Sequence, residues 1–458
     1  MEKVFQLIEQ NKAAMIASIQ ELIHFESVKS EPAAGAPFGV ENRKALDQAL
    51  VLAASFGFTT VNMDGYCGYA EYGAGDEYVA VLGHLDIVAL GEGWSVPPLE
   101  GRIIDNQIIG RGSNDNKGPI IAALYALKAI KDAGIELKHR VRIIFGCNEE
   151  SGMKDMEYYV AHAPSPLFGF TPDGAFPVVY GEKGGIHPFL SMEIVDNGSG
   201  EYIESIFGGD TMNIVPTAVS ATVVSENAAA FVNTANAVAG ITAEIIDGKV
   251  VLQATGIAAH GSTPEKGDNA ITKLVAFLAT QKLNGSIAEF VRIINRIIGR
   301  DVNGQSLGIG YEDQPSGKLT LNLARIRCEN DVVSVGCDVR IPVTFKPEQA
   351  ADDVAKTAAA AGLQLEIGKF THPLYFPKDS YLVTTLNAIF CKHFGKELEP
   401  VTMGGGTYAK KLPNTVAFGM GIPGGKSGRE HNADENADID ELMFGTRVIA
   451  EAMTTLAR

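Results

Sequence analysis

Two apolar segments on either side of a helical segment restrict the fold of this chain more than any other feature. The stretches "EYVAVLGHLD" (77–86) and "HRVRIIFGCNEE" (139–150) predict strands, and "GPIIAALYALKAIKDAG" (118–134) predicts a helix that ends at Gly134. Strands that are apolar along their length are typical of a sheet buried on both faces. The order strand–helix–strand therefore predicts a mostly parallel sheet covered by helices.

Polar side chains follow both strands at the point where each strand ends. His84 and Asp86 close the first strand, and Glu149 and Glu150 follow the second. Functional sites in parallel sheets form at the carboxyl ends of strands. Adjacent like charges cost energy unless a cation or a shared proton offsets them. The pattern predicts a site at this edge, while a solvated loop is the alternative for the two glutamates taken alone.

The pattern of elements changes twice along the chain. Residues 1–186 alternate helices and strands, residues 187–375 carry short strands with two helices, and the alternation returns from residue 376. The middle pattern is typical of an α+β domain with an antiparallel sheet. We therefore predict one α/β domain, 1–186 and 376–458, interrupted by an inserted α+β domain, 187–375. The α/β domain is expected to contain further elements near 2–26 (helix), 41–57 (helix), 379–394 (helix), 415–419 (strand) and 438–456 (helix).

The composition restricts the partners and the compartment. The chain has 458 residues, 46% apolar and 20% charged, with a net charge of −17 and no basic stripe, so a nucleic-acid partner is not expected. Its five cysteines form no CxxC pair, which favours reduced thiols in a cytoplasm. The first 25 residues predict a helix rather than a signal peptide. No run of about 18 apolar residues occurs, so no membrane span is expected.

Five stretches place metal-ligand side chains at the ends of elements. They are "GHLDIV" (His84, Asp86), "GRGSNDNKGP" (Asp115), "NEESG" (Glu149, Glu150), "TPDG" (Asp173) and "GREHNADEN" (His431). Histidines and carboxylates from separate loops are what a divalent cation site requires. Each residue alone is more often a cap or a surface charge. The period of two in "HLD" puts His84 and Asp86 on one face, where Asp86 can accept from the second imidazole nitrogen.

These stretches, in this order, resemble the M20 family of di-zinc peptidases and deacylases, and within it the PepV-type bacterial dipeptidases. Six stretches carry the resemblance: "GHLDIVALGEGW", "GRIIDNQIIGRGSNDNKGP", "GCNEESG", "TPDGAFPVVYGEKG", "GIAAHGSTPEKGDNAI" and "GGGTYA". The resemblance implies that the α/β domain is catalytic and that the inserted domain is a lid. It also implies metal-dependent hydrolysis of dipeptides.

The resemblance further implies two divalent ions per chain, zinc with manganese or cobalt as alternatives. Their implied ligands are His84, Asp115, Glu150, Asp173 and His431. Asp115 bridges the two ions, and Asp86 orients His84. His84 and Asp173 are implied to complete one metal site, and Glu150 and His431 the other. Glu149 is the general base and acid that acts on a water between the metals.

One position departs from the family pattern. The residue after the bridging aspartate is usually aspartate in this family, and here it is Asn116. The family tends to have a cis peptide at that bond. Asparagine can keep a hydrogen bond but loses a negative charge, so metal affinity is the property most affected.

The inserted domain contributes residues to the same site. His260 is predicted at the end of a strand, and the resemblance implies that it stabilises the oxyanion from the lid. The implied substrate contacts are Asn213, Arg340, Gly405 and Gly406. The alternative for Asn213 is a turn residue, and the alternative for Arg340 is a charge on the face of a strand. For the two glycines the alternative is a tight loop.

The length of the inserted segment bears on the substrate. In the dipeptidase branch, the extra lid portion resembles the surface that a second subunit supplies elsewhere in the family. This implies a monomer with a short, closed pocket for dipeptides with a free amino terminus. An N-acyl amino acid deacylase, such as a succinyl-diaminopimelate desuccinylase, shares the metal core and is the alternative enzyme. A non-catalytic binding protein is a further alternative, but it would be expected to have lost Glu149 or a ligand.

Overall fold

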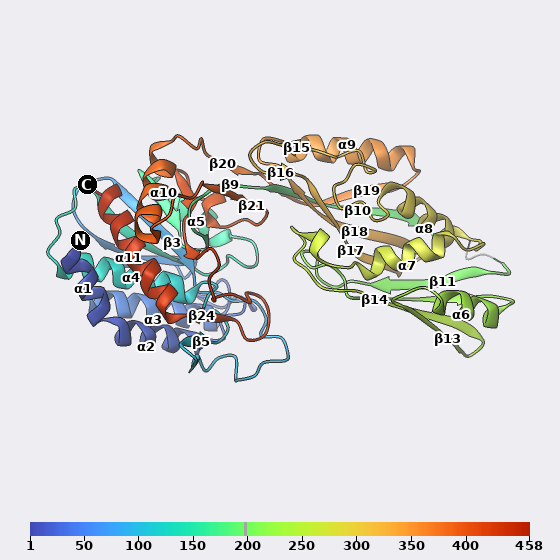
Figure 1. Ribbon diagram of the computed structural model, residues 1–458, viewed down its shortest axis with the longest axis horizontal. Coiled ribbons are helices and arrows are strands. Elements are labelled where there is room, and N and C mark those ends of the chain that lie inside the picture. The colour runs from blue at the N-terminus through green and yellow to red at the C-terminus, as the bar shows by residue number, and fades with distance from the viewer. Residues whose placement is uncertain (197–198) are drawn as a thin grey trace. The chain divides into compact units, whose positions relative to one another are not determined.

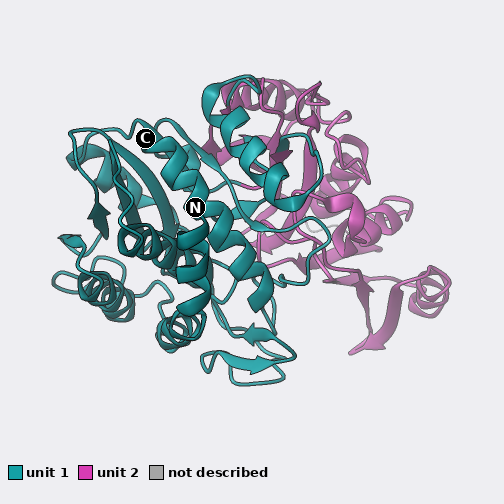
Figure 2. Ribbon diagram, turned by 60° about the vertical axis from the view of Figure 1, so that its left-hand side comes forward, with its two compact units in different colours: residues 1–180, 376–401, 406–458 teal, residues 181–375, 402–405 magenta. Residues whose placement is uncertain are grey.

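The computed structural model describes residues 1–196 and 199–458, which divide into two units (Figure 2). Unit 1 contains residues 1–180, 376–401 and 406–458, and unit 2 contains residues 181–375 and 402–405. The first crossing follows Tyr180, earlier than the predicted boundary after residue 186. The short segment 402–405 lies in unit 2, although the sequence placed it in the first domain.

The sheet of unit 1 has parallel strands at its centre and antiparallel strands at its edges (Figure 1). Its order is β1 (Thr59–Met63), β2 (Cys67–Tyr72), β6 (Arg140–Gly146), β3 (Tyr78–His84), β7 (Phe168–Thr171), β22 (Thr415–Ala417) and β9 (Val179–Glu182). The pairs β6–β3, β3–β7 and β7–β22 are parallel. The carboxyl ends of these strands therefore meet at one edge, as predicted for the α/β domain.

Helices cover both faces of this sheet, which explains its uninterrupted apolar strands. Val79 and Val81 of β3 pack into a core with six helices: α1 (Glu2–Gln10), α2 (Lys12–Ile23), α3 (Val40–Ser55), α4 (Lys117–Asp132), α10 (Tyr381–Phe394) and α11 (Ile439–Leu456). Ala80 and Leu82 point to the opposite face, where they pack with α5 (Lys154–His162) and η2 (Tyr408–Lys410). This alternation follows from the two-residue period of a strand.

The single helix predicted near 2–26 is wrong, because two helices occupy this region. Asn11 separates them, and its side-chain Nδ2 donates to the carbonyl oxygen of Leu7 at 2.7 Å. Such a side-chain bond competes with the helical hydrogen bonds of the main chain. The remaining short strands of unit 1 are β4 (Arg102–Ile104), β5 (Gln107–Ile109), β8 (Gly174–Ala175), β23 (Met420–Gly421) and β24 (Asn436–Asp438).

Unit 2 is built on an antiparallel sheet with helices packed on one face, the α+β arrangement predicted for the inserted segment. The sheet order is β13 (Ile241–Ile246), β14 (Lys249–Thr255), β12 (Ala218–Val224), β11 (Tyr202–Gly208), β17 (Thr320–Glu329), β18 (Val332–Ile341), β10 (Gly184–Glu193) and β19 (Gln364–Thr371). Val333, Val335 and Val339 of β18 pack against the helices. Asp338 and Arg340 alternate with them and lie on the other face.

The remaining elements of unit 2 are short strands and the helices of its core. The helices are α6 (Ala228–Asn236), η1 (Pro264–Lys266), α7 (Ala270–Ala279), α8 (Ser286–Ile297) and α9 (Pro347–Ala360). The short strands are β15 (Glu312–Asp313), β16 (Gly317–Lys318), β20 (Leu374–Tyr375) and β21 (Val401–Met403), the last of which begins at a residue of unit 1.

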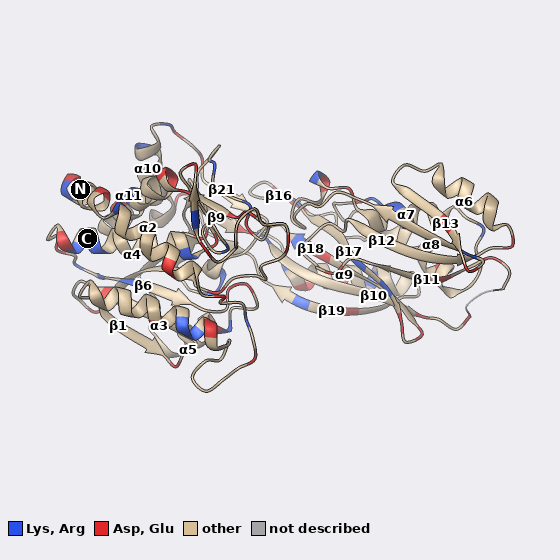
Figure 3. Cartoon of the chain, turned by 90° about the horizontal axis from the view of Figure 1, so that it is seen from below, with Lys and Arg blue, Asp and Glu red and all other residues tan. Residues whose placement is uncertain are grey.

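Charged residues are mixed over both units. Lys and Arg are interspersed with Asp and Glu along the elements (Figure 3). Among the described residues, no helix has the length and apolar character needed to cross a membrane.

Candidate metal centre

Three neighbouring parallel strands deliver the first ligand candidates to one edge of the sheet. His84 is the last residue of β3 and pairs with Gly146, the last residue of β6. Glu149 and Glu150 follow β6 directly, and Asp173 follows β7. The convergence predicted from the sequence is a consequence of the parallel pairing.

His84 presents one ring nitrogen to the site. Its Nδ1 lies 2.9 Å from the main-chain oxygen of Asp86, which can only accept, so Nδ1 carries the proton. The carboxylate Oδ1 of Asp86 is farther, at 3.5 Å, so the side-chain contact expected from the "HLD" spacing is the weaker of the two. The other nitrogen, Nε2, lies 2.9 Å from Asp115 Oδ1 and 3.7 Å from Asp173 Oδ2.

Asp115 lies between two imidazoles. Its Oδ1 faces His84, and its Oδ2 lies 3.1 Å from Nε2 of His431. The same nitrogen of His431 lies 3.3 Å from Oε2 of Glu150. Ligand atoms also lie within 4.8 Å of one another in two sets: His84, Glu149 and Asp173, and His84, Asp115 and Glu150. Nitrogen and carboxylate donors at this density suit divalent cations.

The charges of this cluster are unbalanced in the protein alone. Burial and the carboxylate of Asp173 raise the pKa of Glu149 well above its ordinary value. Hydrogen bonds to Asp115 and Glu150 raise the pKa of His431 to about 11. Both shifts favour the protonated form, through burial and the Asp173 carboxylate for Glu149 and through hydrogen bonds to carboxylates for His431. A divalent cation relieves the same imbalance, which makes the cluster a candidate metal centre.

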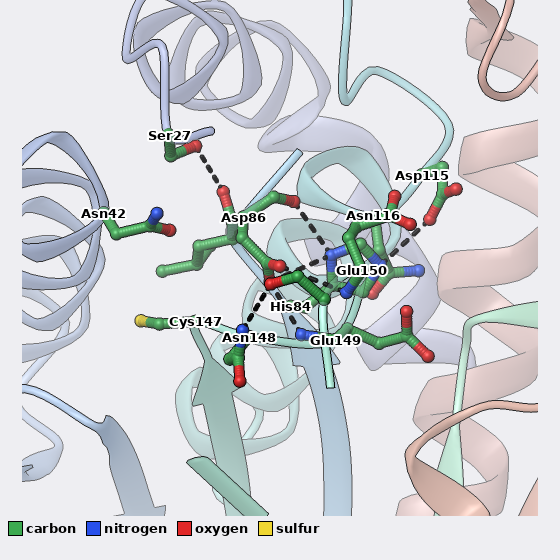
Figure 4. A network of polar contacts seen from close by, with 12 residues as sticks. Ser27, Asn42, His84, Asp86, Asp115, Asn116, Cys147, Asn148, Glu149 and Glu150 are labelled. Carbon is green, nitrogen blue, oxygen red and sulfur yellow. Dashed lines mark hydrogen bonds and ion pairs between the residues drawn. The ribbon is translucent and has the colours of Figure 1, made fainter. Parts of the chain in front are cut away.

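Two buried carboxylates fix the main chain of the ligand loops. The oxygens of Asp86 accept the main-chain N–H groups of Glu149 and Glu150, each at 3.1 Å (Figure 4). Oε1 of Glu435 accepts the N–H groups of Gly112, Asn114 and Asp115, each at 3.0 Å. Asp86 was singled out in the sequence, but Glu435 was not. Its position four residues after His431, inside "GREHNADEN", was the available signal.

Asn116 retains contact with a ligand candidate. It is buried, follows a cis peptide bond with Asp115, and its Nδ2 donates to the carbonyl oxygen of Pro172 at 3.2 Å. The same nitrogen lies 3.4 Å from Oδ1 of Asp173. An aspartate at this position would have no proton to donate to these acceptors unless it were protonated. The asparagine therefore supplies a donor that restrains Asp173.

A buried ion pair anchors the Asp115 loop and has a measurable role in stability. Nη1 of Arg111 lies 2.8 Å from Oε2 of Glu435, and both side chains are almost fully buried. Removing one partner of a buried pair costs about 3–5 kcal/mol, because the other charge is left uncompensated. We therefore expect Arg111→Met to lower the free energy of unfolding of unit 1 by about that amount.

The measurement is urea unfolding followed by fluorescence of Trp94, the one tryptophan of the chain, which lies in unit 1. The control is Arg102→Met, because Arg102 pairs with Glu100 on the surface. An exposed pair contributes about 1 kcal/mol or less. Equal unfolding midpoints for the two variants would contradict the assignment of an anchoring role to Arg111.

Unit 2 contains most of the other predicted site residues, among them His260, Asn213 and Arg340. His260 lies beyond β14, which ends at Thr255, and it pairs with Ile214 in a single bridge, so its predicted place at a strand end is wrong. One further main-chain bond, from the N–H of Gly256 to the carbonyl oxygen of Thr217 at 2.8 Å, follows the last residue of β14. Next to His260, the N–H of Gly261 donates to the carbonyl oxygen of Asn213 at 2.6 Å.

Arg340 is held by a neighbour on its strand. Asp338 is almost fully buried and lies 2.9 Å from both Nε and Nη2 of Arg340. Nη1 of Arg340 reaches the carbonyl oxygen of Gly404 at 3.4 Å. Gly405 belongs to unit 2 and Gly406 to unit 1.

The chain matches known proteins along nearly its whole length. Residues 80–455 match Peptidase family M20/M25/M40. A protein of Bacillus subtilis (strain 168) named "Putative dipeptidase YtjP" is 34% identical over 461 residues, 98% of each chain. "Putative dipeptidase SH1171" of Staphylococcus haemolyticus is 32% identical over 467 residues, again 98% of each chain.

Solved structures share the fold. The dipeptidase Dug1p from Saccharomyces cerevisiae aligns with a TM-score of 0.60 at 14% identity, over 100% of this chain and 98% of that one. Human carnosine dipeptidase 1 aligns with a TM-score of 0.57 at 16% identity, over 100% and 98%. At these identities the similarity describes architecture alone.

Proposed function

The chain belongs to peptidase family M20/M25/M40 and is a metallopeptidase, and on that premise we propose that it hydrolyses dipeptides with a free amino terminus. The observation that carries the metal-dependent hydrolysis in this proposal is the clustering of His84, Asp115, Glu150, Asp173 and His431. Near full-length similarity to proteins named as dipeptidases supports the substrate class.

The donor set fits two divalent cations. His84 and Asp173 would hold one ion, Glu150 and His431 the other, and Asp115 would contact both. Imidazole and carboxylate donors suit zinc, with manganese or cobalt as alternatives. When bound, such ions polarise a carbonyl oxygen and lower the pKa of water toward roughly 7.

Glu149 has the proposed role of general base and acid. It takes a proton from the attacking water and returns it to the leaving amine. Its main-chain N–H is held by Asp86, so the side chain starts from a fixed point. Its carboxylate also lies within 4.8 Å of ligand atoms of His84 and Asp173, so it borders the metal centre. We assign it to proton transfer rather than to metal binding, as the family resemblance implies.

His260 has the proposed role of stabilising the oxyanion. Its Nδ1 lies 2.7 Å from Oγ of Ser262, which can donate or accept, and 3.2 Å from the main-chain N of Ser262, which can only donate. With both groups donating to Nδ1, Nε2 carries the proton that the proposal assigns to developing negative charge. His260 belongs to unit 2 and Glu149 to unit 1, so the proposed chemistry draws on residues of both units.

A substrate series tests the proposed specificity. We expect an N-acetylated dipeptide to show a kcat/KM roughly 5- to 150-fold below that of the free dipeptide, since an unpaired buried group costs about 1–3 kcal/mol. The matching tripeptide should be poorer still, because its extra residue does not fit a pocket limited to dipeptides. The measurement compares kcat/KM for these compounds and for N-succinyl-diaminopimelate, all with the same metal. The rate of the Glu149→Gln variant is subtracted as background. Faster hydrolysis of the acylated compounds would identify a deacylase instead.

A further inference from the structure

A buried carboxylate and a buried phenol contact the segment 147–150, which links β6 to α5 and carries Glu149. We propose that Asp155 and Tyr408 are positioning residues that fix the main chain of this segment and thereby place Glu149 for proton transfer. The inference rests on the proposed role of Glu149 and deepens it. Neither Asp155 nor Tyr408 contacts the substrate in this account.

Asp155 binds the beginning of the segment. Its Oδ2 accepts the main-chain N–H groups of Cys147 at 2.7 Å and of Asn148 at 2.9 Å. The same oxygen accepts the hydroxyl of Tyr408, and Oδ1 accepts the N–H of Met156 at 2.7 Å. The side chain of Asp155 is fully buried. A buried carboxylate is tolerated only when its oxygens accept hydrogen bonds, so each of these donors matters.

Tyr408 connects this carboxylate to the metal-ligand strand. Its hydroxyl occupies the space that a Cβ atom at Gly146 would need, so a side chain cannot be accommodated there without displacement. Its ring lies edge-on to the imidazole of His84, with centroids 6.2 Å apart. Tyr408 is fully buried. The stretch "GGGTYA" was assigned to the pocket lining from the sequence, but its tyrosine has no exposed surface with which to bind a substrate.

Together with Asp86, these residues account for every main-chain donor of the segment. The N–H groups of Cys147 and Asn148 bond to Asp155, and those of Glu149 and Glu150 bond to Asp86. Four consecutive N–H groups are thus held by two buried carboxylates. Catalytic groups act efficiently only within narrow positional tolerance, and loss of a supporting contact is felt in turnover.

The substitution that tests this proposal is Tyr408→Phe, which removes one hydroxyl. We expect kcat to fall about 10- to 100-fold, the range for partners that support catalytic groups, while KM changes by less than about twofold. The assay uses the metal-loaded enzyme at a saturating metal concentration, and the number of metal ions bound per chain is measured. We also expect amide hydrogen exchange of the peptide covering 147–150 to accelerate by about tenfold, since Asp155 loses a donor.

Tyr159→Phe is the matched control. Tyr159 is also fully buried in the same apolar cluster, but its hydroxyl bonds to Arg142 at 2.7 Å and not to the segment 147–150. This variant should lose stability without losing kcat. Equal kcat values for Tyr408→Phe and Tyr159→Phe, or unchanged exchange at 147–150, would overturn the positioning role. A rise in KM without loss of kcat would also overturn it, by indicating a substrate contact.

These outcomes are separate from failure of the proposed function. If Glu149→Gln retains full turnover, the assignment of the base is wrong, whatever Tyr408→Phe does. If the best substrate is acylated, the same comparison is made on that compound. Should Tyr408→Phe fail to fold, Asp155→Asn provides the second variant, for which the same losses of kcat and amide protection are expected.

Discussion

Glu149→Gln is expected to lower kcat by about 10²–10⁴-fold, the contribution typical of a positioned general acid–base group. Glutamine has nearly the shape of glutamate but cannot take a proton from water at neutral pH. Its main-chain N–H can still bond to Asp86, so the segment around it keeps its anchor. The loss should therefore come from proton transfer and not from disorder.

The metal content separates this role from that of the neighbouring glutamate. Two equivalents of divalent metal should remain bound to Glu149→Gln after gel filtration and elemental analysis. Glu150→Gln is the matched control, because the side chain of Glu150 faces His431 at 3.3 Å and is assigned to metal binding. That variant should lose metal at limiting concentrations. Normal turnover in Glu149→Gln, or loss of metal from it, would contradict the assignment.

The parts of the fold that depend on local pattern were predictable. The strands β3 and β6 and the helix α4 follow from apolar runs and from Gly134 at a helix end. The resemblance to the M20 family is confirmed by the match over residues 80–455. The convergence of His84, Glu149 and Glu150 followed from strand order, because parallel strands end at one edge.

The contacts that support the site were not predictable from local pattern. Glu435 binds N–H groups that precede it by more than 300 residues, and Tyr408 meets Asp155 across a similar gap. No sequence spacing marks a carboxylate that accepts main-chain N–H groups, because the donors belong to a loop that is distant along the chain. The same reason applies to Asp86. Its spacing of two residues from His84 was visible in the sequence, but its hydrogen bonds to the N–H groups of Glu149 and Glu150 were not.

His260→Ala is expected to lower kcat by about 10²–10³-fold, the effect of removing one oxyanion donor. Ser262 contacts Nδ1, so the proposal assigns the donated proton to Nε2, and alanine has no donor to replace it. His372→Ala is the matched control in the same unit, since His372 is exposed and forms an ion pair with the surface residue Glu348. It should leave kcat unchanged.

Mixing variants then tests whether one chain supplies both groups. An equimolar mixture of His260→Ala and Glu149→Gln chains has intact copies of each residue on different chains. If His260 acts within its own chain, as the length of the inserted segment implies, the mixture shows only the residual rates of the two variants. Exchange of subunits in a dimer that shares its sites would instead restore about a quarter of the wild-type rate, because half of the dimers would be mixed and one of the two sites in each mixed dimer would be intact. Restored turnover would therefore contradict the expected monomer and favour a dimer in which each site borrows His260 from the partner, and it would leave the proposed roles of Glu149 and of the metal ligands unchanged.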